Sequence, residues 1–292
     1  MWYEITIEGR AAPMDRLRHR LAFSELCREN GGVLDGQGRS RLCIREDEKR
    51  LDDRLLALAD ILDAEEQGQE GTDGFEIHVR NLAQSEPLSG SAEFIEPFTP
   101  VAGLTIQPWQ PTMASQPTGC TVVIDPAYAF GTGKHPSTRL CLEFIAELAT
   151  ARLEPAAGLL DLGCGTGVLA MAAVRLGLAR TALGVDLDPQ AAAAAARNVG
   201  LNGLDRQVAI RTGSWEEVPG RYPVIIANLV SAVMLRAGRR LPDYLQAPGL
   251  AIVAGFAEPQ AEMIARFFRE LGLVVRQRKT LEGWSALLLE RN

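Results

Sequence analysis

A short apolar stretch leads into a loop with glycine at every second position. The loop reads Leu160-Asp161-Leu162-Gly163-Cys164-Gly165-Thr166-Gly167. Glycine has no Cβ, so a loop of this composition lets the backbone approach a ligand closely. The spacing differs from the dinucleotide-binding motif GxGxxG, because Val168 stands where that motif has its third glycine. A second glycine segment, at 131–134, does not form a phosphate-binding loop, because His135 follows its lysine in place of serine or threonine.

An aspartate, Asp186, ends the next apolar stretch along the chain. A carboxylate at such a place can accept hydrogen bonds from both hydroxyl groups of a ribose. Asp186 lies 23 residues beyond Gly163, which is the reach of one strand-helix-strand unit. The glycine loop and the carboxylate therefore predict a site for a nucleoside ligand. The alternative is a chance glycine turn in an unrelated α/β protein.

The elements that must position these residues alternate between strand and helix from about residue 120. Apolar strands are predicted at 158–162, 181–185, 208–211, 224–227 and 250–254, with helices at 167–176, 189–198, 231–245 and 259–271. Strands at 274–279 and 284–290 are close enough in sequence to form a hairpin. We expect an α/β fold with a doubly wound, mostly parallel, seven-stranded sheet, to which the hairpin adds an antiparallel edge strand. Ligands of such sheets bind beyond the carboxyl ends of the strands.

The first 80 residues have shorter elements and predict a smaller α+β domain. Strand patterns occupy 2–8, 41–45 and 75–79, and helical apolar spacing occupies 13–30 and 52–62. Residues 81–119 are rich in proline, serine, glycine and glutamine, which predicts a linker with a short strand at 104–107. The expected domains are therefore 1–80 and 120–292, joined by a linker at 81–119.

The composition excludes several classes of function. The chain has 292 residues, with 30 Lys and Arg against 37 Asp and Glu, so we expect no direct nucleic-acid binding through a basic face. The start of the chain lacks the pattern of a secretory signal, and no apolar run is long enough to span a bilayer. We therefore expect a cytoplasmic protein without membrane contact. The five cysteines form no CxxC pair and the three histidines are dispersed, so we expect no metal site.

The segment from Asp125 to Thr138 carries the most specific motif of the chain. It reads DPAYAFGTGKHPST and resembles the DPxxAFGTGxHPTT signature of the ribosomal protein L11 methyltransferase family. The DxGxGxG spacing that begins at Asp161 is similar to the S-adenosylmethionine site of class I methyltransferases, which include that family. The resemblance covers about residues 94–290, and a leucine-rich helix is expected after the motif. Earlier residues agree only in the order of strands and helices.

The resemblance implies a set of cofactor-binding residues. Four stand at the family's contact positions, namely Thr138, Gly163, Asp186 and Asn228, while Asp161, Gly165 and Gly167 complete the glycine loop. A loop from Phe130 to His135, which includes Gly131, Thr132 and Gly133, is expected to close over the cofactor. Ser214, just past a predicted strand, is a candidate for binding the adenine end.

Two residues are candidates for catalysis. Asn228 ends an apolar strand, where an unpaired amide would be costly, and in related amine methyltransferases this position faces the transferred methyl group. Its carbonyl could accept a hydrogen bond from an incoming amine, whereas the alternative role is a cap for the next helix. His135 is a candidate general base, and the alternative is that it holds the loop in place.

By resemblance, the chain is a protein-lysine N-methyltransferase that uses S-adenosylmethionine. Its expected partner is ribosomal protein L11, methylated on lysine side chains and on the α-amine. The paired tryptophans that the family carries before its linker are absent from 81–94, and the family uses its amino-terminal domain to hold the substrate. One alternative is therefore a methyltransferase that acts on another protein or a small amine. The other is a non-catalytic cofactor-binding module.

Overall fold

A computed structural model describes residues 2–10, 39–47, 76–81, 96–111, 117, 119–125, 131–151 and 154–292. The chain divides into two compact units. The first unit contains Met1–Glu86 together with Ser231–Arg236, and the second contains Pro87–Val230 and Ala237–Asn292. Within the described ranges, no helix has the length and apolar composition needed to cross a membrane.

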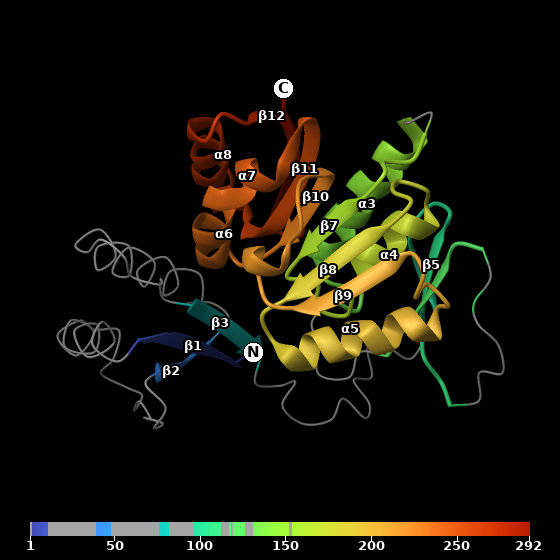
Figure 1. The fold of residues 1–292 in the computed structure, drawn as a ribbon, viewed down its shortest axis with the longest axis horizontal. Helices are drawn as coiled ribbons and strands as arrows, with labels where there is room; N and C mark the ends of the chain where they lie inside the picture. The colour runs from blue at the N-terminus through green and yellow to red at the C-terminus, as the bar shows by residue number, and fades with distance from the viewer. Residues whose placement is uncertain are drawn as a thin grey trace. The chain divides into compact units, whose positions relative to one another are not determined.

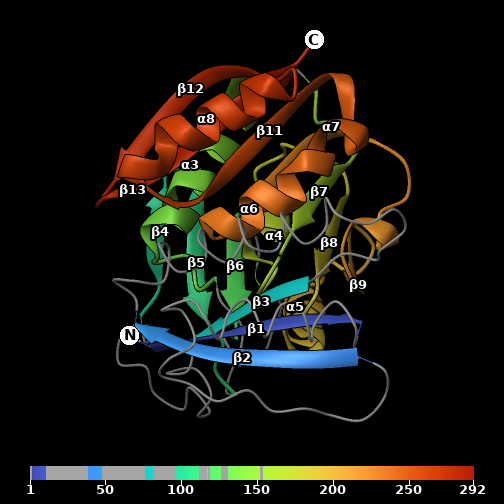
Figure 2. The same ribbon diagram turned by 90° about the vertical axis from the view of Figure 1, so that its left-hand side faces the viewer.

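The first unit contains a three-stranded antiparallel sheet in the order β2-β1-β3 (Figure 2). The strands are β1 (Trp2–Arg10), β2 (Arg39–Asp47) and β3 (Glu76–Asn81), so the three strands predicted in this region are confirmed. In the central strand, Ile5 is paired with Ile44 and Val79. Apolar residues of neighbouring strands thus share one row, as the two-residue period of a strand requires. The helices predicted at 13–30 and 52–62 lie outside the described residues.

The second unit is built around a seven-stranded sheet in the order β12-β13-β11-β10-β7-β8-β9 (Figure 1). Neighbouring strands are parallel, except that β13 is antiparallel to both of its neighbours. This arrangement confirms the predicted doubly wound α/β fold. The strands are β7 (Leu159–Leu162), β8 (Ala182–Asp186), β9 (Val208–Thr212), β10 (Tyr222–Asn228), β11 (Leu245–Ala257), β12 (Val274–Leu281) and β13 (Trp284–Arg291).

Helices cover both faces of this sheet, with α3, α4 and α5 on one face and α8 on the other (Figure 1). The helix α3 is the leucine-rich helix expected after the Asp125–Thr138 motif, and it buries Leu140, Phe144 and Ile145 in the core. Alanine is the strongest helix former, which explains why the alanine run of α5 is helical, and Asp188 caps its first turn. The helices are α3 (Pro136–Ala151), α4 (Val168–Arg175), α5 (Pro189–Leu201), α6 (Ser231–Ala237), α7 (Leu241–Tyr244) and α8 (Ala261–Glu270).

The position of the antiparallel strand differs from the prediction. We expected the hairpin to add an antiparallel edge strand, but β13 lies inside the sheet, between β11 and β12, and β12 is the edge. The physical reason lies in the two sequences. The middle of β13, from Ala286 to Leu289, is apolar and buried, whereas β12 carries Arg276, Gln277 and Arg278 in exposed positions. Charged residues suit an edge strand, because they discourage pairing with other chains.

The helix predicted at 231–245 is broken into separate turns. It consists of α6, a 3₁₀ turn at Gly238–Arg240, and the short helix α7. Gly238 weakens a helix, and Pro242, in the first turn of α7, lacks the N–H group that a continuous helix needs. The predicted range is therefore helical as far as Tyr244, but it is divided at the glycine and the proline.

A third, three-stranded sheet has the order β4-β5-β6 and belongs to the second unit. Its strands are β4 (Phe98–Val101), β5 (Leu104–Pro108) and β6 (Thr121–Ile124). The strand predicted at 104–107 is thus confirmed, but β4 also lies within the predicted linker, and β6 follows it. The buried residues Leu104, Ile106 and Val122 join the same core as α3 and the large sheet. Part of the range predicted as a linker is therefore packed structure.

Candidate functional site

The glycine loop forms the turn between β7 and α4. Gly163, Gly165 and Gly167 have φ angles of +70°, +54° and +78°, in the left-handed region that glycine adopts without strain. The N–H groups of Gly163 and Cys164 both donate to the carbonyl oxygen of Val185, at 2.8 and 3.0 Å. A Cβ at Gly163 would also overlap Leu229 Cδ2, the end of a side chain that would have to move aside, so the turn depends on glycine chiefly for its conformation.

Asp186 ends β8 and contacts this loop directly. Its Oδ2 accepts a hydrogen bond from the Gly165 N–H at 2.8 Å, and its Oδ1 accepts one from the Asp188 N–H at 3.0 Å. The two features that the sequence placed at neighbouring strand ends are therefore in contact. The main-chain bonds hold the carboxylate at the carboxyl edge of the sheet, where it remains partly exposed.

Asp161, in contrast, lies inside the fold. It is only 1% exposed, and its Oδ2 accepts a hydrogen bond from the Ala170 N–H in α4 at 3.1 Å. Its Oδ1 is buried and has no hydrogen-bond partner among the described residues. Burial raises the pKa of Asp161 to about 7, the bond from Ala170 opposes this shift, and the charge of Asp186 adds to it. The carboxyl group thus braces the start of α4 beneath the loop.

Thr138 and Asn228 meet where α3 approaches the end of β10. The Asn228 side-chain Nδ2 donates to Thr138 Oγ1 at 3.3 Å, and Thr138 is buried. Two residues that the resemblance assigned to the cofactor site are therefore paired with each other.

The segment from Gly131 to Lys134 packs against two different neighbours. The Gly131 carbonyl oxygen accepts a hydrogen bond from Thr166 Oγ1 at 2.5 Å, which ties the segment to the glycine loop. A Cβ at Gly133 would overlap Ile106 of β5, and the Gly133 φ is +90°. Thr132, between the two glycines, is partly exposed. Phe130 lies outside the described residues.

His135 stands at the start of α3 and acts there as a helix cap. Its Nδ1 accepts a hydrogen bond from the Ser137 N–H at 3.3 Å, and the Ser137 hydroxyl lies 2.8 Å from the same nitrogen. The imidazole ring packs edge-on against Trp284, with 4.6 Å between the ring centroids. These contacts support the structural alternative for His135, and its assignment as a general base stays a prediction.

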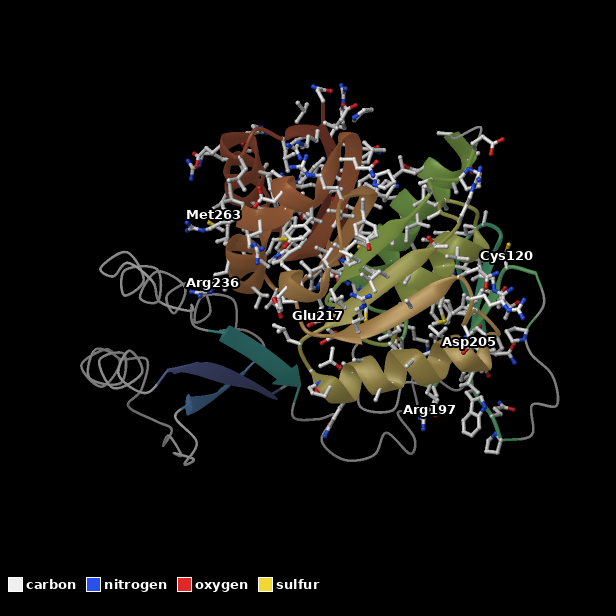
Figure 3. The ribbon with its side chains drawn as sticks, in the orientation of Figure 1. Cys120, Arg197, Asp205, Glu217, Arg236 and Met263 are labelled. Atoms are coloured by element: carbon white, nitrogen blue, oxygen red, sulfur yellow. The ribbon has the colours of Figure 1, made fainter. Side chains whose placement is uncertain are left out.

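The remaining candidates lie near β9 and in the core. Ser214 follows β9 and is partly exposed, and its N–H donates to Glu216 Oε1 at 2.8 Å. Cys164 is buried against Gly184, and burial raises the pKa of its thiol well above the usual range, which suits a packing residue. Cys120 is exposed and lies at the right-hand edge of the view in Figure 3, whereas Glu217, which follows β9, lies near its middle. The described residues include no cluster suited to bind a metal ion.

Two asparagines, one in α5 and one at its C-cap, also bind main-chain groups of other segments, and the sequence analysis did not single them out. Asn198 and Asn202 are buried, and they stand one helical turn apart on an otherwise alanine-rich helix. Asn202 bonds to both main-chain groups of Val123 in β6. A pair of amides at this spacing, on the face of a helix that alanine otherwise occupies, is the signal that could have identified them.

The arrangement fits the adenosine part of S-adenosylmethionine. The oxygens of an ionised carboxylate accept hydrogen bonds, which is the chemistry that ribose hydroxyls require, and Asp186 stands partly exposed at the end of β8. The backbone of the glycine loop beside Asp186 has the positive φ angles that favour glycine, so no side chain at these positions separates it from a ligand. The residues present are therefore suited to hold a nucleoside ligand at the carboxyl ends of β7 and β8.

Comparisons with known proteins agree with this geometry. A model of the family described as "Ribosomal protein L11 methyltransferase (PrmA)" matches residues 47–292. The ribosomal protein L11 methyltransferase of Geobacter metallireducens is 34% identical over 73% of this chain and 68% of its own length. That of Pelobacter propionicus is 36% identical over 73% of this chain and 69% of its own. The crystal structure of a ribosomal protein L11 methylase from Lactobacillus delbrueckii subsp. bulgaricus aligns with a TM-score of 0.58 at 27% identity, covering 68% of this chain and 99% of that one.

Proposed function

Because this chain belongs to the ribosomal protein L11 methyltransferase (PrmA) family, whose members depend on S-adenosylmethionine, we propose that it methylates ribosomal protein L11. The acceptors are amino groups, on lysine side chains and on the α-amine. The observation that carries the proposal is the direct contact between the glycine loop and Asp186, beside the Thr138–Asn228 pair. This contact supports the proposal because it joins the candidate ribose-binding carboxylate to the glycine turn.

In this proposal the donor is held by residues at the carboxyl ends of β7, β8 and β9. Asp186 accepts hydrogen bonds from the ribose hydroxyls. Gly163 allows the backbone of the loop to approach the ligand closely, and Ser214 is the candidate for binding the adenine. Asp161 is buried and does not itself contact the ligand. It holds the start of α4, which follows the glycine loop, through its hydrogen bond from the Ala170 N–H. When bound, S-adenosylmethionine supplies a methyl group on a positively charged sulfur, which is a good leaving group.

The acceptor amine is positioned by Asn228. Its Oδ1 accepts a hydrogen bond from the amine and directs the nitrogen lone pair towards the site, while Thr138 holds its Nδ2. A free lysine has a pKa of about 10.4, so its ammonium must lose a proton before it can react. Positioning two reactants in the correct geometry contributes about 7–11 kcal/mol, so no nucleophilic side chain is required.

We assign different roles to the two parts of the chain. The first 80 residues recognise the acceptor protein, and the second unit, which begins at Pro87 and so includes most of the predicted linker, binds the donor. Every donor-site residue assigned above falls in the second unit. A substrate made and assembled on ribosomes also places the protein in the cytoplasm, and no direct contact with nucleic acid is needed.

The experiment that tests the function is methyl transfer to purified ribosomal protein L11. Labelled S-adenosylmethionine should label L11, and mass spectrometry should find the added methyl groups on amines. Transfer to another component of a cell extract but not to L11 would show a different acceptor. Tight binding of the donor with no transfer to any amine would show a non-catalytic module.

The variant Asp186→Ala tests the donor site in the same assay. It removes two hydrogen bonds to a charged group, each worth about 1.5–3 kcal/mol, so donor affinity should fall about 100-fold or more. Asp188→Ala is the matched control. It removes the cap of α5, which accepts from Gln190 N–H, and should lower stability by about 1 kcal/mol while donor affinity is retained. An unchanged dissociation constant in Asp186→Ala would remove the basis of the proposed site.

A further inference from the structure

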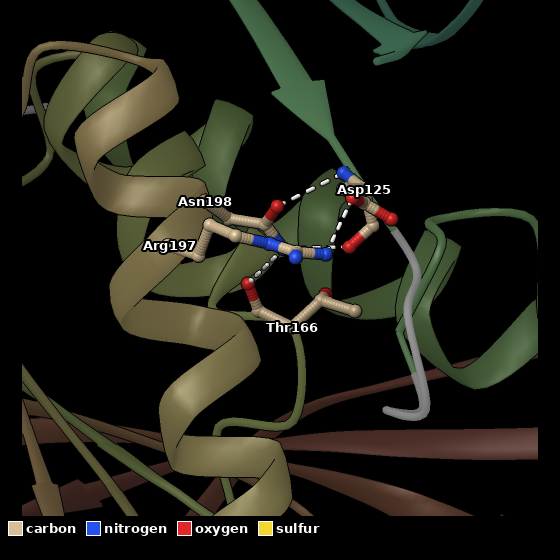
Figure 4. A network of polar contacts seen from close by, with 4 residues as sticks. All are labelled: Asp125, Thr166, Arg197 and Asn198. Atoms are coloured by element: carbon tan, nitrogen blue, oxygen red, sulfur yellow. Dashed lines mark hydrogen bonds and ion pairs between the residues drawn. The ribbon is translucent and has the colours of Figure 1, made fainter. Parts of the chain in front are cut away.

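Asn198 connects the glycine loop of the donor site to the residue that follows β6, which is far from it in sequence. Its Oδ1 accepts from the Asp125 N–H at 2.9 Å, and its Nδ2 donates to the carbonyl oxygens of Asp125 and Thr166, both at 3.1 Å (Figure 4). Asp125 follows β6, and Thr166 belongs to the glycine loop. The buried side chain of Asn198 therefore binds the main chain of both segments.

Two neighbouring contacts involve the same segments of the chain. The Arg197 guanidinium, adjacent on α5, pairs with the Asp125 carboxylate at 2.5 Å (Figure 4). The Thr166 hydroxyl donates to the carbonyl oxygen of Gly131, six residues beyond Asp125. Both Asp125 and Gly131 are thus tied to the glycine loop, and Asn198 is the only residue of Figure 4 that bonds to Asp125 and to Thr166.

The chemistry of this position requires an amide. The main-chain groups present one donor and two acceptors, and asparagine offers one oxygen and two N–H hydrogens, so every group is satisfied. Aspartate of the same shape could accept from Asp125 but could donate to neither carbonyl. An alanine would remove one buried and two partly buried hydrogen bonds to the main chain, which is costly.

We propose that Asn198 is a positioning residue for S-adenosylmethionine binding, which holds the glycine loop at a fixed distance from the end of β6. The residue acts through the main chain of Thr166 and Asp125 and does not contact the ligand. The inference rests on the proposed donor site. It assigns to α5 a role in donor affinity beyond that of a packing helix.

The test compares Asn198→Ala with Asn202→Ala. Both variants remove a buried amide from the same face of α5, and Asn202 bonds to Val123 in β6 but not to the glycine loop. Titration calorimetry with S-adenosylmethionine should show the dissociation constant raised at least ten-fold in Asn198→Ala and less than three-fold in Asn202→Ala. A purely structural role would lower the binding stoichiometry and melting temperature of both, and leave the two dissociation constants equal, which would overturn the proposal.

Two further measurements complete the test. Asn198→Asp leaves no cavity and should raise the dissociation constant as Asn198→Ala does, and binding as in the unchanged protein would overturn the proposal. The proposal would also be overturned if the chain folds with Asn202→Ala but with neither Asn198 variant, because Asn198 would then serve folding alone.

In the Asn198 variants, the KM for the donor should rise while the KM for the protein acceptor stays within two-fold. If Asp186→Ala also leaves affinity unchanged, the donor site itself is wrong; if only Asn198→Ala does, this inference alone fails.

Discussion

Asp161 makes the stability of the fold depend on pH. Its pKa is raised from about 3.8 to about 7 by burial, so the folded state binds a proton that the unfolded chain has already released. Between about pH 4 and pH 7, raising the pH therefore lowers stability, by up to 4 kcal/mol for a shift of about three pKa units. Below and above this window the contribution of Asp161 is constant.

The variant Asp161→Asn should remove this dependence, because the amide does not ionise. Urea unfolding of the donor-free protein at pH 4.5 and pH 8 should show a larger loss of stability for the unchanged chain than for Asp161→Asn. The control is Asp188→Asn, since that carboxylate lies at an exposed helix start and should leave the difference intact. Equal pH dependence in the unchanged chain and Asp161→Asn would show that Asp161 is ionised throughout.

His135 can be tested as a cap and as a base separately. Its Nδ1 accepts the Ser137 N–H at the start of α3, so His135→Ala should lower stability by about 1 kcal/mol. Asparagine is a good helix cap and a poor base, so His135→Asn should keep both stability and most of kcat. A large loss of kcat in a stable His135→Asn protein would instead support the general-base assignment.

At the scale of the element, the turn between β7 and α4 depends on the left-handed backbone conformation of its glycines. Gly163→Ala places a Cβ at φ +70° and against Leu229 Cδ2. The left-handed conformation alone costs about 1–2 kcal/mol in a residue other than glycine. We expect that loss of stability together with a drop of at least ten-fold in donor affinity, measured by thermal unfolding and calorimetry.

Gly177→Ala is the matched control for this turn. Gly177 has a φ of +77° and open space where its Cβ would stand, so the substitution adds the conformational cost without overlap. It should lower stability and leave donor affinity unchanged. Should both variants lose affinity to the same extent, the effect would come from general destabilisation and not from the shape of the turn.

At the scale of the whole molecule, donor binding and acceptor recognition should separate. A fragment of residues 87–292 contains every assigned donor-site residue and the core that surrounds them. Because the fragment keeps all of these residues, its dissociation constant for S-adenosylmethionine should lie within about three-fold of that of the full chain, a difference of roughly 0.6 kcal/mol in binding free energy. Its methylation of ribosomal protein L11 should be lost, since residues 1–80 are proposed to hold the acceptor. Full methylation by the fragment would place acceptor recognition in the second unit.

The sequence by itself determined the fold class, the family and the pairing of the glycine loop with Asp186. These features depend on local patterns: apolar strands that end in Gly163 and Asp186 must bring both residues to one edge of a parallel sheet. The motif at Asp125–Thr138 identified the family, because many residues must occur at fixed spacing. The roles of Asp161 and His135 were less accessible, since a carboxylate or an imidazole at a strand or helix end can face either the ligand or the backbone.

Only the tertiary structure decided which polar groups meet across the chain. It inserted β13 between β11 and β12, because burial of an apolar strand depends on what covers it and not on its place in the sequence. It turned Asp161 inward to α4, paired Asn228 with Thr138, and joined Asn198 to both Asp125 and Thr166. Such hydrogen bonds link main-chain and side-chain groups of distant segments, so their partners exist only once the chain has folded.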